Sequence, residues 1–218
     1  PPMSAFFPEV FFQIFGSQDW AYYLLSQIFI IVAFYYVFKL ATEVLGNIKL
    51  SLISVLLLES IYFYNFTTPE FNVNVCQLPF WSLVVYYSWK IYETKKIKLI
   101  DCFLVGLFAT LGFLSKYLFI YLLVSIDLLF IWLIFIKKTK KFDFKYLISV
   151  EVFIVLLVPH LIWLFENDFI TILYGLQRTG LESSNILDHF KFPLIFLAKQ
   201  IGLLIPFLIL IFLLVKKI

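Results

Sequence analysis

The sequence predicts an all-α integral membrane protein: a bundle of about seven transmembrane helices with one short interfacial helix. Hydrophobic residues make up 63% of the 218 residues and charged residues only 14%, and the mean hydropathy is +0.99. A water-soluble domain cannot cover that much apolar side-chain surface. At a length of roughly 20 residues, only helices satisfy their backbone hydrogen bonds in lipid. We therefore expect a single transmembrane domain over residues 1–218.

Basic residues predict which ends of the helices face the cytoplasm. Thirteen of the 17 lie in four clusters that long apolar runs separate. Because lysine and arginine collect in cytoplasmic loops, the loops 38–50, 89–99 and 136–146 and the C-terminus are placed inside. The clustered residues are Lys39, Lys49, Lys90, Lys95, Lys96, Lys98, Lys137, Lys138, Lys140, Lys141, Lys145, Lys216 and Lys217. The opposite face then carries the other four, which are Lys116, Arg178, Lys191 and Lys199.

Seven apolar segments reach or approach the length that crosses a bilayer, and the loops between them alternate as the lysine clusters require. They cover residues 20–38, 50–66, 71–89, 99–115, 117–136, 146–164 and 193–215. Before them, residues 4–15 form an apolar stretch of about three turns, too short to cross. This stretch suits a helix that lies along the membrane surface and ends at Gly16. Most of the outer charge falls in the loop 165–192.

Composition also argues against several classes of function. The net charge of +3 is explained by topology, so it predicts no nucleic-acid partner. Cys76 and Cys102 lack C-x-x-C spacing, and His160 and His189 are far apart in sequence, so no metal or redox motif is visible. We expect no bound cofactor, although a divalent metal requirement stays open.

Lys116 lies where two apolar segments meet at the outer face. It is either a lysine that snorkels to the interface or a ligand for a lipid phosphate. Tyr117 beside it is either a second phosphate-site residue or an ordinary interfacial aromatic. Arg178, the only arginine, suits either a bidentate phosphate contact or an ion pair with Glu182.

Glu70 has two interpretations at the start of the third span. Thr67 and Glu70 have the spacing of a capping box. Alternatively, Glu70, Asn74 and Gln77 follow the spacing i, i+4, i+7, which places all three on one helix face, with Asn72 on another. Amide and carboxylate groups near the outer surface suit sugar hydroxyls, so this stripe is a candidate binding surface.

Three carboxylates lie within predicted spans. Glu59, Asp127 and Glu151 are costly in lipid unless they are paired, protonated or in contact with water. They suit interhelical hydrogen bonds, or an ion relay in a transporter. His160, near the outer end of the sixth span, suits either a substrate oxygen or a helix cap.

Short motifs along most of the chain occur in an order that resembles a known family. They are Pro1-Pro2-Met3 with Phe15-Gly16, Pro69-Glu70-Phe71-Asn72-Val73-Asn74, Leu78-Pro79-Phe80-Trp81, Gly106 with Gly112-Phe113-Leu114-Ser115-Lys116-Tyr117, and Pro159-His160 with Trp163, Asn167-Asp168-Phe169, Tyr174 and Arg178. The sequence is similar to the dolichyl-phosphate-mannose protein mannosyltransferase-like proteins of glycosyltransferase family 39. The bacterial aminoarabinose lipid A transferases are relatives.

The resemblance implies a GT-C membrane glycosyltransferase of a bacterial inner membrane. Such an enzyme transfers a sugar from a polyprenyl-phosphate donor to a lipid, glycan or protein acceptor at the extracytoplasmic face. A carboxylate acts as general base and the phosphate leaves with inversion, which requires cationic stabilisation. Its implied phosphate-site residues here are Lys116, Arg178 and Tyr117. Its implied sugar or acceptor residues are Glu70, Asn72, Asn74, Gln77, His160 and Trp163.

One departure from the family concerns the catalytic base. The family's acidic motif lies in the first outer loop, before the Pro-Pro, and this chain starts at Pro1 and Pro2 without an initiator methionine. We therefore expect an internal piece of a longer protein, inactive alone, with its base upstream of Pro1 and Glu70 as the substitute candidate. The alternatives are a transporter or lipid flippase that uses the intramembrane carboxylates, and a non-catalytic scaffold.

Overall fold

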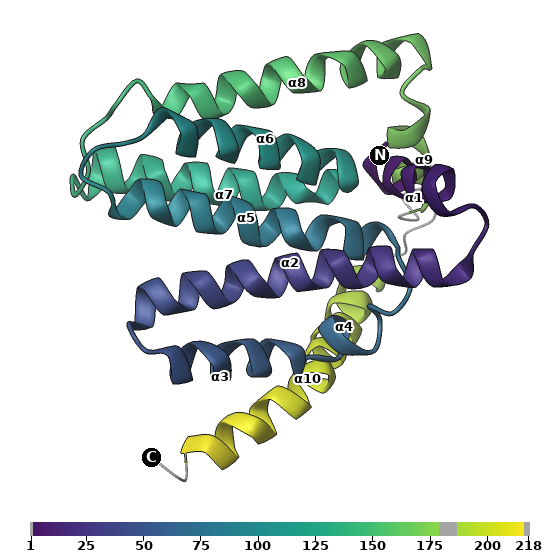
Figure 1. Cartoon of the computed structure of the whole chain (residues 1–218), viewed down its shortest axis with the longest axis horizontal. Helices are drawn as coiled ribbons and strands as arrows, with labels where there is room; N and C mark the ends of the chain where they lie inside the picture. The colour runs from purple at the N-terminus through teal and green to yellow at the C-terminus, as the bar shows by residue number, and fades with distance from the viewer. Residues whose placement is uncertain (1, 179–186, 216–218) are drawn as a thin grey trace. The chain divides into compact units, whose positions relative to one another are not determined.

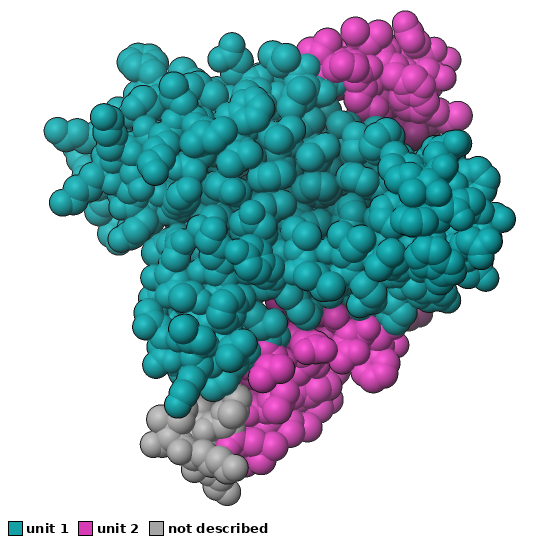
Figure 2. All heavy atoms as spheres, in the orientation of Figure 1, with its two compact units in different colours: residues 1–55, 68–157 teal, residues 56–67, 158–218 magenta. Residues whose placement is uncertain are grey.

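The computed structural model describes residues 2–178 and 187–215, and every regular element in these residues is helical. The predicted all-α class is confirmed. The chain divides into two compact units, coloured in Figure 2: unit 1 contains residues 1–55 and 68–157, and unit 2 contains residues 56–67 and 158–218. The expectation of a single transmembrane domain stays a prediction.

Unit 1 is built around a row of neighbouring helices, with α5 between α2 and α6 (Figure 1). Its elements are α1 (Met3–Phe15), α2 (Asp19–Leu45), most of α3 (Ile48–Glu59), α5 (Val73–Glu93), α6 (Leu99–Ser115), the 3-10 turn η1 (Tyr117–Phe119), α7 (Ile120–Ile131), the π-helix η2 (Trp132–Ile136) and the first half of α8 (Tyr146–Glu166). Side chains such as Leu25 and Phe29 of α2 and Val75 and Val84 of α5 form its buried core. These apolar contacts hold α2 and α5 together.

Gly106 allows α8 to approach α6 closely. A Cβ atom at this position would lie 2.5 Å from the carbonyl oxygen of Ser149 and 2.8 Å from the Cβ of Val152. The Ser149 hydroxyl also donates to the carbonyl oxygen of Cys102 over 2.9 Å. A larger residue at position 106 would separate the two helices.

Unit 2 contains α4 (Tyr62–Asn65), α9 (Ile170–Arg178), α10 (Asp188–Val215) and the C-terminal ends of α3 and α8. Helix α9 lies in the loop 165–192, for which no helix was predicted. Its residues Ile170, Leu173 and Tyr174 have the spacing of one helix face, which is the signal that could have indicated it.

Four helices in the described residues are long and apolar enough to cross a membrane: Asp19–Leu45, Tyr117–Ile136, Tyr146–Glu166 and Asp188–Leu213. Large apolar side chains on them are exposed, such as Tyr121 at 67% and Leu128 at 59%. Lipid rather than water is the solvent that such surfaces require. The protein is a multi-pass membrane protein. Helix α6 is apolar but has 17 residues, and α5 is a longer, more polar helix of 21 residues.

The continuous helix predicted over residues 50–66 is wrong. Helix α3 ends at Glu59, and α4 starts at Tyr62 after Ile61, whose ψ of 124° is extended. The Ser60 hydroxyl donates to the carbonyl oxygen of Leu57 over 2.6 Å. Such a local bond offers the backbone an alternative to the helix, so the chain bends here.

The helix predicted over residues 4–15 is confirmed as α1. It ends at Gly16, whose φ of 71° lies in the left-handed region that favours glycine. The Gly16 N–H donates to the carbonyl oxygen of Phe12 over 2.7 Å. The position of α1 along the membrane surface stays a prediction.

Candidate functional site

The ammonium group of Lys116 contacts the side chain of Asn74. The Lys116 Nζ donates to the Asn74 Oδ1 over 2.6 Å, and these residues lie 42 positions apart. Within the described residues, Lys116 has no carboxylate partner. A neutral amide therefore orients the lysine and leaves its positive charge uncompensated.

The backbone around Lys116 is shaped by Gly112 and Phe119. Lys116 ends α6 in an extended conformation, with φ −159° and ψ 124°. Its N–H donates to the Gly112 carbonyl, and its own carbonyl accepts from the N–H of Phe119. The fully buried Phe119 ring covers Gly112, where a Cβ atom would overlap the ring. The short turn at Ser115 and Lys116, visible in the sequence, depends on this glycine.

A second contact between α5 and α6 lies beside the lysine. The Cys76 thiol donates to the Ser115 hydroxyl over 3.2 Å, and both residues are fully buried. Ser115 in turn donates to the carbonyl oxygen of Leu111 over 2.7 Å. Because Cys76 and Ser115 adjoin Asn74 and Lys116, this contact fixes the register in which the amide meets the ammonium.

Asn72 caps α5, which corrects the capping-box interpretation. Its Oδ1 accepts from the backbone N–H groups of Asn74 and Val75, over 2.9 Å and 3.2 Å. The hydroxyl of Thr67 instead donates to the carbonyl oxygen of Phe63. Thr67 and Glu70 therefore form no capping box.

The prediction that Glu70, Asn74 and Gln77 share one helix face is wrong. Helix α5 begins at Val73, so Glu70 precedes the helix. Asn74 and Gln77 remain one turn apart on α5. The Gln77 Oε1 accepts from the indole N–H of Trp81 over 3.2 Å. The predicted stripe is thus reduced to two amides, each already bonded to a neighbouring side chain.

Glu70 lies in a cavity of about 310 Å³ that also contains a second carboxylate, Asp19. The cavity is lined by Pro8, Asp19, Tyr22, Tyr23, Glu70 and Phe71. Sequence reasoning missed Asp19 and both tyrosines. Only the packing of α1 and α2 beside the segment before α5 brings them together. Two carboxylates beside aromatic rings suit the hydroxyl groups and the apolar face of a sugar.

Burial lowers the pKa of Lys116 below the usual value for a lysine. The shift has a desolvation cause, since removing water disfavours the charged form. An anion bound at this position would compensate the positive charge of the Lys116 ammonium. Tyr117 is half-buried beside it, with its ring 5.3 Å from that of Phe113.

The other predicted site residues belong to unit 2. His160 is buried, at 9% exposure, and its ring stacks on Trp163 with a centroid distance of 5.8 Å. His160 does not cap a helix, because α8 continues to Glu166. Arg178 ends α9. Its predicted alternative partner, Glu182, lies outside the described residues.

The three carboxylates of the predicted spans lack ionic partners among the residues that the structure describes. Glu59, Asp127 and Glu151 have exposed side chains, and none forms an ion pair within residues 2–178 and 187–215. Over the same residues, no group of three or more His, Cys, Asp or Glu side chains is placed to hold a metal ion. The polar groups described around Lys116 are thus its ammonium and the neighbouring amides and hydroxyls.

A family model described as dolichyl-phosphate-mannose-protein mannosyltransferase matches residues 1–163. The chain belongs to this family. The match covers well over half of the sequence, and it contains Lys116, Asn74 and Glu70 and extends to Trp163. Membership identifies a mannosyltransferase-type glycosyltransferase and confirms the resemblance seen in the motifs. No curated protein and no solved structure matches the chain.

Proposed function

We propose that this protein transfers a sugar from a polyprenyl-phosphate donor to an acceptor at the extracytoplasmic face of a bacterial inner membrane, and that Lys116 binds the donor phosphate. The observation that carries the proposal is the 2.6 Å contact from Lys116 Nζ to the neutral Asn74 Oδ1. A carboxylate partner would have neutralised the ammonium. An amide holds it in place and leaves its charge for an anion.

The reaction places its largest charge change on the phosphate. An acceptor hydroxyl attacks the sugar C1 as the bond from C1 to the phosphate oxygen breaks, and a carboxylate takes the hydroxyl proton. Negative charge then develops on the leaving phosphate. The Lys116 ammonium stabilises that charge, and its effect is strong because the site is partly shielded from water. Tyr117 and Arg178 are proposed as further phosphate ligands.

The cavity that contains Asp19 and Glu70 is proposed to bind the sugar or the acceptor. Its carboxylates accept hydrogen bonds from hydroxyls, and Tyr22 and Tyr23 supply aromatic surface. Glu70 remains the candidate for the base among the residues of this cavity. We keep His160 and Trp163 as proposed acceptor contacts because their rings stack on one another.

Two amides retain weaker support as sugar ligands. The Asn72 Oδ1 is occupied by the N-terminus of α5, and the Gln77 Oε1 by Trp81. Asn74 acts through Lys116. We therefore propose Asn72 as a positioning residue for α5 rather than a direct sugar contact.

The test is transfer of sugar from a polyprenyl-phosphate donor in membranes that contain the full-length protein, and the variants below are made in it. Lys116→Ala should lower kcat/KM by about 100-fold or more, since it removes the cation at the leaving phosphate. Lys96→Ala, which removes an exposed lysine of the opposite cluster, is the matched control and should leave transfer unchanged. Full activity of Lys116→Ala at equal expression would exclude the lysine from the site.

A further inference from the structure

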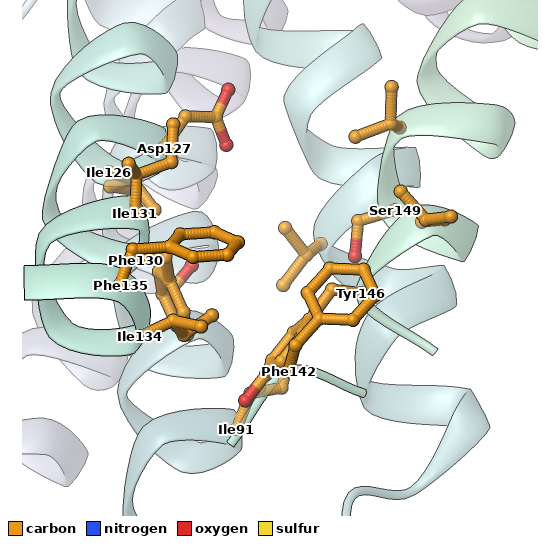
Figure 3. A pocket seen from close by; sticks show the side chains of 14 residues that line it. Ile91, Ile126, Asp127, Phe130, Ile131, Ile134, Phe135, Phe142, Tyr146 and Ser149 are labelled. Atoms are coloured by element: carbon orange, nitrogen blue, oxygen red, sulfur yellow. The ribbon is translucent and has the colours of Figure 1, made fainter. Parts of the chain in front are cut away.

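A second cavity, of about 330 Å³, opens between α7 and α8 in unit 1 (Figure 3). Its walls are mostly apolar, with Ile91, Phe130, Phe135 and Phe142 among them. Figure 3 shows Asp127 and Phe130 reaching from α7 towards Tyr146 and Ser149 of α8. The cavity is separate from the residues around Lys116 and Glu70, none of which lines it.

Asp127 places a carboxylate in this apolar cavity. It lies near the middle of the span Tyr117–Ile136, where an unpaired carboxylate is expensive. Its side chain has no hydrogen bond or ion pair within the described residues. Two lysines at the ends of α5 and η2 have other partners: Lys90 Nζ is 2.8 Å from the carboxylate of Asp101, and Lys137 Nζ lies 5.0 Å from the ring centroid of Trp132.

Ser88 adds a second unpartnered polar group to the same cavity. Its side chain is 7% exposed, and its Oγ is buried without a hydrogen-bond partner among the residues that the structure describes. It lines this cavity and an adjoining one of about 350 Å³. A buried hydroxyl without a partner is rare, because it loses its hydrogen bonds to water and gains none in return.

The span that carries Asp127 departs from regular α-helix beside the cavity. Residues Trp132–Ile136 form the π-helix η2, and Ile134 and Phe135 of this segment are cavity walls. The π-helix ends the span, with Lys137 as its C-terminal cap. The carboxylate, the hydroxyl and residues of the π-helix thus line one cavity.

We infer that this cavity binds a single-chain amphiphile with a primary ammonium head group. The ammonium complements the Asp127 carboxylate in charge and donates a further hydrogen bond to the Ser88 Oγ, while the alkyl chain fills the apolar walls. Both orphaned polar groups would thereby gain partners. Asp127 is exposed at the surface of the helix, so an amphiphile in the surrounding lipid can reach the cavity. This inference is independent of the proposed sugar transfer.

The experiment measures thermal unfolding of the protein in phosphatidylcholine nanodiscs with dodecylamine as the probe. At ten times its Kd, dodecylamine should raise Tm by about 3–6 °C. Dodecanoate, which carries the same chain but the wrong charge, should leave Tm unchanged. Dodecanol separates charge from hydrogen bonding, and a rise in Tm equal to that with dodecylamine would overturn the ammonium assignment.

Variants then locate the binding. Asp127→Asn keeps the shape of the side chain and should abolish the rise in Tm, and Ser88→Ala should weaken it. The matched control is Ser125→Ala on the same helix, whose hydroxyl donates to the carbonyl oxygen of Tyr121. It should respond as the wild type does. A rise in Tm that persists in Asp127→Asn would overturn the site, and the unliganded Tm of each variant shows that it folds.

Discussion

Lys116 and Asn74 are joined by a 2.6 Å hydrogen bond that crosses from the end of α6 to the first turn of α5. The bond connects the residue predicted to bind phosphate with one predicted to bind sugar. Its acceptor is neutral, so the pair as a whole carries one positive charge. That charge is the property on which the following predictions depend.

Asn74→Asp should weaken donor binding although Lys116 is retained. A carboxylate at this position would pair with the ammonium and compete with the donor phosphate. We expect KM for the polyprenyl-phosphate sugar to rise about 10- to 100-fold, the range of one charged hydrogen bond. Steady-state kinetics at varied donor concentration measure the change. An unaltered KM would show that the phosphate does not meet Lys116.

Activity should fall at alkaline pH because burial lowers the pKa of Lys116. The ammonium is fully charged below that pKa, so phosphate stabilisation is present there and is lost as pH rises through it. The loss therefore begins at lower pH than for an ordinary lysine. The pH profile of kcat/KM measures this fall, which forms the alkaline limb of the profile.

Lys116→Arg is the matched variant for the pH profile. A guanidinium keeps its charge across the accessible range, so whatever activity the variant has should lack the alkaline limb. If the limb is the same in both proteins, another group produces it.

Gly112→Ala should destabilise the turn that carries Lys116. The added methyl group would overlap the buried ring of Phe119, and overpacking of this kind costs about 1–3 kcal/mol. We expect a lower midpoint of thermal unfolding and reduced transfer. Gly202→Ala is the control, because a methyl group added there would meet no neighbouring atom within 4 Å among the described residues. Equal midpoints for the two variants would contradict the packing argument.

Asn72→Ala should lower stability by about 0.5–2 kcal/mol, the range for loss of an N-terminal helix cap. Asn72→Ser keeps a capping oxygen and should retain both stability and transfer. Chemical denaturation and the transfer assay together separate the two roles. Loss of transfer in a stable Asn72→Ser protein would instead favour a direct sugar contact.

The position of Lys116 was predictable, but its partner was not. Apolar runs on both sides of the lysine leave room only for a tight turn at the membrane surface. The contact with Asn74 depends on the register of α5 against α6, which Cys76 and Ser115 hold from positions 39 residues apart. No local pattern in the sequence encodes that register.

The start of α5 was also predictable only in part, because more than one residue type near it can cap a helix. Thr67 and Asn72 are both acceptable caps by residue type. The Ser26 hydroxyl of α2 donates to the carbonyl oxygen of Thr68, which is buried, while Thr67 bonds back to Phe63. These contacts end the α4 turn and hold residue 68 against α2. Asn72 is then the residue that caps the helix.

The sequence by itself determined the helical class, the membrane environment, the family and the short turn at Lys116 between two apolar segments. Composition, span length and charge distribution are sums over single residues, so they can be evaluated without knowing how the helices pack. Tertiary structure alone decided that Asn74 contacts Lys116, that Glu70 lines a cavity with Asp19, and that Ser88 and Asp127 line another. Those pairings arise from helix register, which is set by shape contacts between residues far apart in the chain.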